Sequence, residues 1–290
     1  MNSKINVEKK SEVNEKRVKL EQFYHPDNYE RVAERELDLE AKLYLSVILR
    51  GALSGGLSII KPLESIDQKL TPTTDFTVEM VKSLTTRKII VPHSSSSLMA
   101  FSDGDDFPKQ YEIFKVYYWL NIKPSDGAYE EMIRRLMYPH TENLVGVEDF
   151  CYDMWKKIAT HELFEYIQYQ LKKIDFPSIY PNKKTATVFE QLLDYFSMAE
   201  ICYVIDQGIN HVSRLFLEGK LVNLMAANEV INFCESYAEM AIAKNWKLKK
   251  FRRDEHLTPS LISKVFFTTM LGDPNIGFYE SPGNSLTHIF

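Results

Sequence analysis

The sequence is poor in glycine and proline, which account for 11 and 12 of its 290 residues, and it contains only three cysteines. So few turn formers favour long regular elements and argue against a loop-rich β-sandwich or a disordered chain. The cysteines, Cys151, Cys202 and Cys234, lie far apart and show no zinc-type spacing. We therefore interpret them as buried, reduced thiols.

Long apolar runs are missing as well. The most apolar stretch, residues 43–60, is interrupted by Arg50 and then by a glycine-rich turn. A central arginine opposes insertion into a bilayer, so no membrane partner is expected. The first 19 residues contain no apolar core of a secretion signal. These absences predict a cytoplasmic protein.

Signatures of the common enzyme classes are also absent. The sequence has no GxGxxG, no P-loop lysine, no GxSxG elbow and no kinase motif set. These absences make the common enzyme classes a weaker expectation. They do not prove inactivity, because catalytic residues often lie far apart in a sequence. No cofactor is predicted.

What the chain does contain is enough apolar material for a real core. It is 44% hydrophobic and 26% charged, with 17 phenylalanines and 16 tyrosines. Its formal net charge is −5. Proteins that coat DNA are usually basic because their affinity comes from neutralising phosphates, so the overall charge argues against that role.

The hydrophobic periodicity predicts a mainly α protein in three parts. Residues 1–25 form a charged tail or a solvated helix, residues 26–124 a domain that contains the only strands, and residues 125–290 a helical bundle. Helices of the bundle are predicted at about residues 128–138, 148–174, 185–218, 221–244 and 259–271.

Residues 71–122 show a distinctive order of elements. A helix (TPTTDFTVEMVKSL) is followed by a strand (RKIIVPH), a polar loop (SSSSLMAFSDGDDFPKQ) and a second strand (YEIFKVYYWLNI) with apolar residues at alternate positions. Together with the helix before it, the segment 28–122 resembles a winged-helix module. The resemblance implies a small β-hairpin and a recognition helix.

Two interpretations of this module stay open. A DNA-reading member would carry Arg, Lys, Asn or Gln along the recognition helix, and this chain offers Lys82 there with Arg87 and Lys88 at its end. The same helix carries Asp75 and Glu79. The alternative is a module that packs or contacts proteins without reading DNA.

The sharpest basic cluster is KNWKLKKFRR at residues 244–253, in which Trp246 and Phe251 are interleaved with cations. Basic groups neutralise phosphates and aromatic rings stack on bases, which suits nucleic acid. The same composition suits an exposed connector whose apolar residues hold it to the bundle. The six cations are Lys244, Lys247, Lys249, Lys250, Arg252 and Arg253.

A metal site is the third possibility. In the sequence HELFE, His161 and Glu165 lie one helical turn apart, which resembles part of a zincin motif but lacks its second histidine. A further ligand would have to come from elsewhere, for example from His140, His211 or Glu200. The plainer interpretation is a polar helix face on which His161 and Glu165 form an i,i+4 pair.

Three functional hypotheses follow. The first is a non-enzymatic interaction or regulatory protein that binds a protein partner or forms a homo-oligomer through its helical faces. The second is a DNA-binding regulator that uses the winged-helix-like module and the basic segment 244–253. The third is a metal-dependent hydrolase centred on His161 and Glu165.

Overall fold

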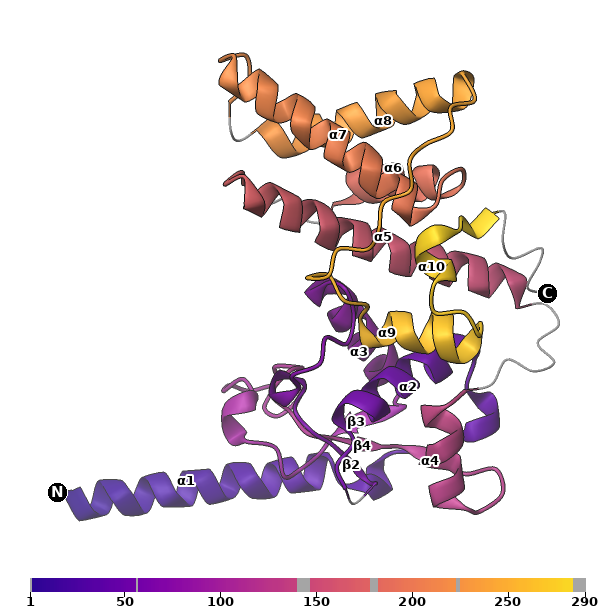
Figure 1. The fold of residues 1–290 in the computed structure, drawn as a ribbon. Coiled ribbons are helices and arrows are strands. Elements are labelled where there is room, and N and C mark those ends of the chain that lie inside the picture. Colours follow the sequence, from indigo (N-terminus) through magenta and orange to yellow (C-terminus); the bar gives the residue numbers. More distant parts are fainter. Residues whose placement is uncertain (1, 56, 140–146, 178–181, 223–224, 284–290) are drawn as a thin grey trace. The chain divides into compact units, whose positions relative to one another are not determined.

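A computed structural model describes residues 2–55, 57–139, 147–177, 182–222 and 225–283, with side chains from Lys10 onward. The chain divides into two compact units, one formed by Met1–Leu70 with Thr77–Pro139 and the other by Thr71–Phe76 with His140–Phe290. Helices make up 59% and strands 6%, which confirms the mainly α class (Figure 1). Among the described residues, no helix combines the length and apolarity needed to cross a bilayer.

The helices of the first unit are α1 (Asn2–Phe23), α2 (Leu39–Ala52), most of α3 (Thr74–Thr86) and α4 (Tyr129–Met137). Helix α2 is its core element, because every residue from 43 to 49 is buried. Asp38 caps α2 by accepting a hydrogen bond of 2.8 Å from the amide of Ala41. Helix α4 packs on α2, where the Ser46 hydroxyl donates to the carbonyl of Met137 at 2.7 Å.

The strands of the first unit are short. They are β1 (Val32–Ala33), β2 (Ile59–Ile60), β3 (Ile90–Pro92), β4 (Tyr118–Leu120) and β5 (Ile122–Lys123). β1 pairs in parallel with β5, and β4 lies between β2 and β3 in an antiparallel sheet. Short 3-10 turns occur at Pro26–Asn28, Glu34–Glu36, Leu63–Ser65 and Leu98–Ala100. The central strand of the sheet is thus the last of its three in the sequence.

The strand predicted to end at residue 122 is much shorter than its alternating pattern indicated. Tyr111 forms an isolated β-bridge with Phe101, residues 112–117 are irregular, and strand structure begins at Tyr118. Pro92 ends β3 and has no amide hydrogen to donate. Beyond it, the Ser96 hydroxyl accepts from the amide of Tyr117 at 2.9 Å. The amide of His93 still donates to the carbonyl of Tyr117 at 2.7 Å, so the side chain of Ser96 replaces only the reciprocal bond from Tyr117, and the regular ladder goes no further.

The first unit continues along the chain as far as Pro139. Helix α4 belongs to the first unit because Met132, Ile133 and Leu136 are buried on the side that packs on α2. The short segment Thr71–Phe76, which includes the first turn of α3, belongs to the second unit. Local sequence signals mark where helices and strands end, but they do not reveal which of these elements pack against one another.

The charged N-terminal segment forms helix α1. Its last part is anchored within the first unit, since Leu20 and Tyr24 are buried. The Arg17 guanidinium donates to the carbonyls of Ser94 and Ser96 at 2.6 and 2.9 Å. These bonds tie α1 to the polar loop that follows β3.

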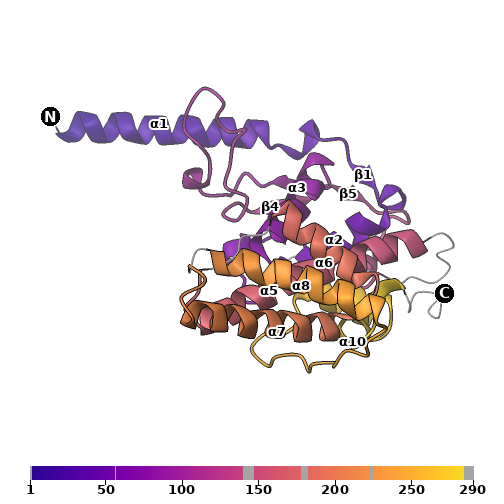
Figure 2. The same ribbon diagram turned by 90° about the horizontal axis from the view of Figure 1, so that it is seen from above.

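The second unit is helical throughout its regular structure in the described residues. It contains α5 (Glu148–Lys173), α6 (Lys183–Leu193), α7 (Met198–Leu217), α8 (Ala226–Ala243), α9 (Leu261–Ser263) with a π-helical continuation Lys264–Met270, and α10 (Ile276–Tyr279). Helices α7 and α8 form a hairpin, and α5 packs against α6 and α7 (Figure 2). Trp155, Phe164 and Phe189 are fully buried in its core.

The helix predicted at residues 185–218 is two helices, α6 and α7. The break is explained by a capping box, in which the Glu200 carboxylate accepts from the amide and the hydroxyl of Ser197 at 2.9 and 2.6 Å. Helices also occur at the other four predicted positions, although α8 begins later than expected, at Ala226.

Candidate functional sites

The basic segment 244–253, called here the basic strap, follows α8 and has no regular secondary structure beyond residue 245. Leu248 is buried, which anchors the middle of the strap on the second unit. Further along, the amide of Phe251 donates to the carbonyl of Ala199 at the start of α7, at 3.0 Å. The strap is therefore a connector held by its apolar residues, by backbone bonds from its first residues to the end of α8 and by the bond from Phe251 to α7.

One of its cations points into the protein. The Arg253 guanidinium donates to the buried carboxylate of Glu162 on α5 at 3.0 Å and lies 4.5 Å from the centre of the Phe278 ring. The other oxygen of Glu162 accepts from the Ser263 hydroxyl at 2.6 Å, and Ser263 is within 2.9 Å of the Ser260 hydroxyl. Arg253 thus serves the fold, and this contact was not anticipated from the sequence.

The other cations of the strap face solvent. Lys250 bonds to the carbonyl of Tyr279 and lies 3.5 Å from the Glu280 carboxylate. The remaining four are exposed and form no ion pair with any described residue. They are Lys244, Lys247, Lys249 and Arg252. The structure therefore separates Arg253, paired with a buried carboxylate, and Lys250, paired at the surface, from four cations without an ion pair among the described residues.

Aromatic rings of the strap join a row on α7 and α8. Trp246 meets Tyr237 edge-on at 5.6 Å, and Phe251 meets Tyr203 edge-on at 5.5 Å. Lysines lie against these rings: the ammonium of Lys244 is 5.3 Å from the Trp246 ring and that of Lys249 is 5.6 Å from the Phe251 ring. Trp246 is 40% exposed. The rings consequently form a partly exposed aromatic surface beside the cations.

The predicted basic residues of the first unit do not form a comparable group. Lys82 is exposed on α3, where its neighbours on the exposed face are Asp75 and Glu79. Arg87 forms an ion pair with Asp38 at 3.0 Å. Lys88 adopts a left-handed backbone with φ of 56°, which turns the chain from α3 into β3. Lys88 also lines a cavity of the first unit.

His161 and Glu165 lie on α5 as the helical spacing predicts. The His161 Nδ1 is 2.7 Å from the Thr73 hydroxyl, and its ring stacks on Phe76 at 4.7 Å. In the part of the chain that the structure describes, no group of three or more His, Cys, Asp or Glu residues is arranged to hold a metal. Of the suggested further ligands, His211 stacks on Phe233, Glu200 belongs to the capping box, and His140 lies outside the described residues.

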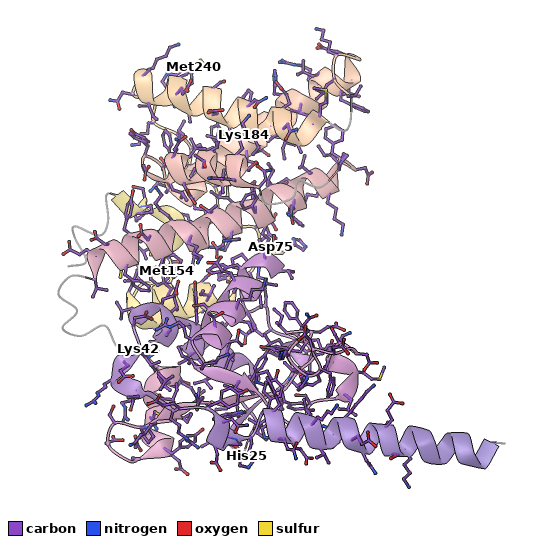
Figure 3. The ribbon with its side chains drawn as sticks, turned by 180° about the vertical axis from the view of Figure 1, so that it is seen from behind. His25, Lys42, Asp75, Met154, Lys184 and Met240 are labelled. Atoms are coloured by element: carbon purple, nitrogen blue, oxygen red, sulfur yellow. The ribbon has the colours of Figure 1, made fainter. Side chains whose placement is uncertain are left out.

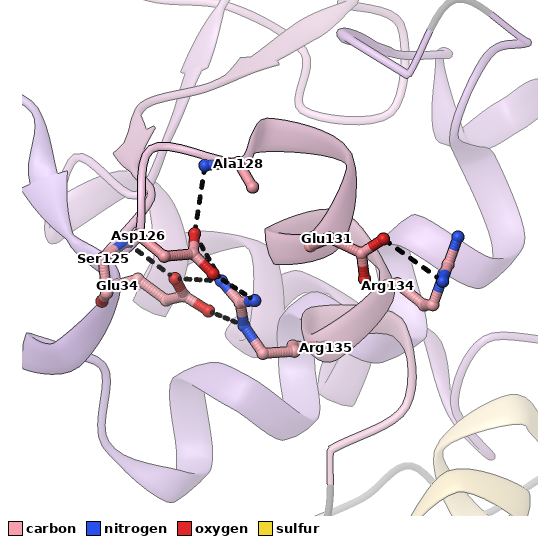
Figure 4. Close-up of polar contacts among 7 residues, drawn as sticks. All are labelled: Glu34, Ser125, Asp126, Ala128, Glu131, Arg134 and Arg135. Carbon is pink, nitrogen blue, oxygen red and sulfur yellow. Dashed lines mark hydrogen bonds and ion pairs between the residues drawn. The ribbon is translucent and has the colours of Figure 1, made fainter.

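Sequence reasoning missed a charged cluster in the first unit (Figure 4). Arg135 donates to both oxygens of Glu34 at 2.7 and 2.8 Å and to Asp126 at 2.9 Å. These hydrogen bonds from Arg135 hold the pKa of the Glu34 and Asp126 carboxyls below their usual values. Glu34 and Arg135 are 101 positions apart, so no local pattern signals their pairing.

Comparisons with protein-family models, with curated proteins and with solved structures found no match. Among the described surfaces, the basic strap combines uncompensated charge with exposed aromatic area.

Proposed function

We propose that this protein is a non-enzymatic binding protein, and that its basic strap recognises an acidic, partly apolar segment of a partner protein. The observation that carries the proposal is the group of four exposed cations without ion pairs beside an exposed tryptophan. Charge complementarity steers association and selects partners, whereas a buried tryptophan supplies much of the energy of an interface.

The strap carries four exposed cations, Lys244, Lys247, Lys249 and Arg252. All four project from an extended segment of ten residues, and no described carboxylate pairs with them. Salt screens charges that lie more than about 10 Å apart, so charges close together in the strap reinforce one another more than those at its two ends. Because the whole chain carries a net charge of −5, this is a local reversal of sign that favours an acidic partner.

Exposed apolar side chains lie beside these cations in the sequence, at the end of α8. Met240, Ile242 and Trp246 are 44%, 43% and 40% exposed, and they follow one another where α8 leads into the strap. Figure 3 shows Met240 on the outer side of α8. Side chains of this size add hydrophobic contact at an interface. A partner that offers both carboxylates and apolar residues matches both features.

A nucleic acid is the competing ligand, and the ring geometry disfavours it. Bases stack on open ring faces, but Trp246 and Phe251 are packed edge-on against tyrosines and a lysine lies against each ring. The acidic residues on the exposed face of α3 add no phosphate contacts. DNA binding through the strap therefore remains the alternative outcome of the test.

For the first unit we propose a winged-helix-like module that acts as a scaffold. Its support is the chain order α2, β2, α3, β3 and β4, with β4 in the middle of an antiparallel sheet. We also propose a cytoplasmic location for the whole protein, since the three cysteines are buried free thiols, as is usual in reducing compartments.

A photo-crosslinking experiment tests the ligand class. A crosslinking amino acid replaces the exposed Asn245 in the full chain, expressed in the cells that naturally produce it, and the same replacement at Glu190 on α6 serves as the control. Captured segments rich in Asp and Glu with interspersed apolar residues are expected at Asn245 only. Capture of nucleic acid would select the alternative. Basic segments, or equal capture at both positions, would overturn the proposal.

The captured segment is then synthesised and titrated against matched charge variants. Replacing Lys244, Lys247, Lys249 and Arg252 with Gln is expected to weaken binding at least about tenfold, a change of about 1.4 kcal/mol. Replacing Lys183, Lys184, Lys220 and Lys264, which lie elsewhere on the second unit, removes the same charge. If both sets of substitutions weakened binding equally, the partner would be attracted by the overall charge of the second unit and not by the strap.

A further inference from the structure

The first unit contains an open cavity of about 890 Å³ that the strap proposal does not use. Its walls come from the end of α1, the turn after it, the end of α3, β3 and residues 107–111. Ligand pockets usually measure about 300–1,000 Å³. The cavity is therefore large enough for an organic molecule of many atoms.

The aromatic lining of the cavity is held in place by contacts within the unit. The Tyr24 hydroxyl donates to the carbonyl of Pro108 at 2.9 Å, which ties the end of α1 to residues 107–111. Tyr24 also lies parallel to Tyr29 at 6.5 Å and edge-on to Tyr111 at 6.5 Å. The side-chain amide of Asn28 donates to the carbonyl of Gln22 at 2.6 Å, which fixes the turn. These walls are preformed.

The charge of the lining has a single sign. Three lysines, Lys19, Lys88 and Lys109, line the cavity, and no Asp or Glu is among its described lining residues. Lys109 pairs with Asp106 at 3.1 Å through largely exposed side chains, and such a surface pair is weak. Lys19 and Lys88 form no ion pair with a described residue. The lining thus offers three lysines, and no carboxylate, to an anion.

We propose that this cavity binds a small molecule that combines a planar aromatic ring system with an anionic group. The ring would lie against Tyr29 and Tyr111, and the anion would be held by Lys19, Lys88 and Lys109. Nucleotides and aromatic carboxylates share this chemistry. Ring–ring contacts and ammonium–anion pairs each contribute binding energy. A ligand that carries both features is therefore expected to bind more tightly than one that carries either alone.

Isothermal titration of the full chain distinguishes the two sources and tests each feature. The probes are adenosine monophosphate, 1-naphthoate, inorganic phosphate and the uncharged 1-naphthalenemethanol. At least one of the first two is expected to bind saturably and at least about tenfold more tightly than phosphate or the alcohol. If inorganic phosphate bound as tightly as the two aromatic anions, the proposed role of the rings would be wrong. If neither aromatic anion bound saturably at millimolar concentration, the proposed site would be wrong.

Charge-matched variants locate the site. Replacing Lys19, Lys88 and Lys109 with Gln should weaken the bound anion at least about tenfold. Replacing Lys61, Lys82 and Lys123, exposed lysines of the same unit outside the cavity lining, should leave it unchanged. Tyr29→Leu adds a test of the ring contact, with circular dichroism as the check on folding. If both lysine sets weaken binding equally, the proposal is wrong.

Discussion

The Arg253 guanidinium donates to the Glu162 carboxylate at 3.0 Å, which joins the basic strap to a helix residue 91 positions earlier in the chain. The adjacent Arg252 is exposed and has no such partner among the described residues. Two neighbouring arginines of one basic cluster thus have different tasks. One stabilises the fold, and the other is available to a ligand.

Arg253→Met should strongly destabilise the second unit. The substitution leaves the Glu162 carboxylate, which is 4% exposed, without its cation, and removing one partner of a buried pair costs about 3–5 kcal/mol. Arg252→Met is the matched control and should change the free energy of unfolding by less than about 0.5 kcal/mol. Urea titration at neutral pH measures both. Equal, small losses would show that the buried pair contributes nothing.

Arg135→Gln should remove an acid-sensitive part of the stability. The folded-state pKa values of Glu34 and Asp126 are lowered chiefly by hydrogen bonds from Arg135. The stabilisation is therefore complete above the unfolded pKa values of about 4 and is lost as the pH falls through the lower folded values. The difference in unfolding free energy between wild type and variant should shrink from pH 7 towards pH 3.

Arg134→Gln is the control for this prediction. Arg134 pairs with Glu131 at 3.3 Å through exposed side chains (Figure 4), and such pairs contribute little. Its stability curve should follow the wild type across the same pH range. A constant difference between wild type and Arg135→Gln from pH 7 to pH 3 would contradict the assigned role of the cluster.

The three thiols should resist alkylation in the native protein. Burial raises the pKa of Cys151 to about 11 and that of Cys234 to about 12, and it also raises the pKa of Cys202. At pH 8 the reactive thiolate is therefore scarce, and the sulfur atoms lie within the core. Ellman's reagent should modify all three quickly in denaturant and none quickly without it. A fast native reaction at any one would refute this.

Gly277→Ala should destabilise the second unit. A Cβ atom at this position would lie 2.5 Å from the Phe267 ring. That ring cannot easily move, because it packs edge-on against Trp155 at 5.4 Å and Phe266 at 5.0 Å. Overpacking of this kind costs about 1–3 kcal/mol. Gly55→Ala, where no atom lies within 4 Å, is the control, and thermal unfolding should separate the two variants.

Local sequence signals predicted much of the helical structure but not the length of the strands. Periodicity marked α8 because this helix buries one stripe of apolar residues. The alternating pattern failed at residues 112–117, where the amide of Tyr117 donates to the Ser96 hydroxyl and the ladder ends with the bond from the His93 amide to the Tyr117 carbonyl. The capping box at Ser197 and Glu200 was a readable signal for the break between α6 and α7.

The sequence also identified some parts of the candidate sites and missed others. The sequence identified the basic strap by composition, and it located His161 and Glu165 on a helix. It did not reveal that Arg253 is committed to Glu162, nor that Lys19, Lys88 and Lys109 line one cavity. These groupings join residues that are far apart in the chain, so no periodic pattern or spacing records them.

By itself, the sequence determined the helical class, the buried state expected of its cysteines and the place of its most basic segment. Short-range physics is enough for these, since helical periodicity, turn residues and charge are written locally. Only the tertiary structure decided which cations face solvent and which are neutralised inside. That outcome depends on which carboxylates the packing brings within hydrogen-bond distance, and the packing is set by the whole chain.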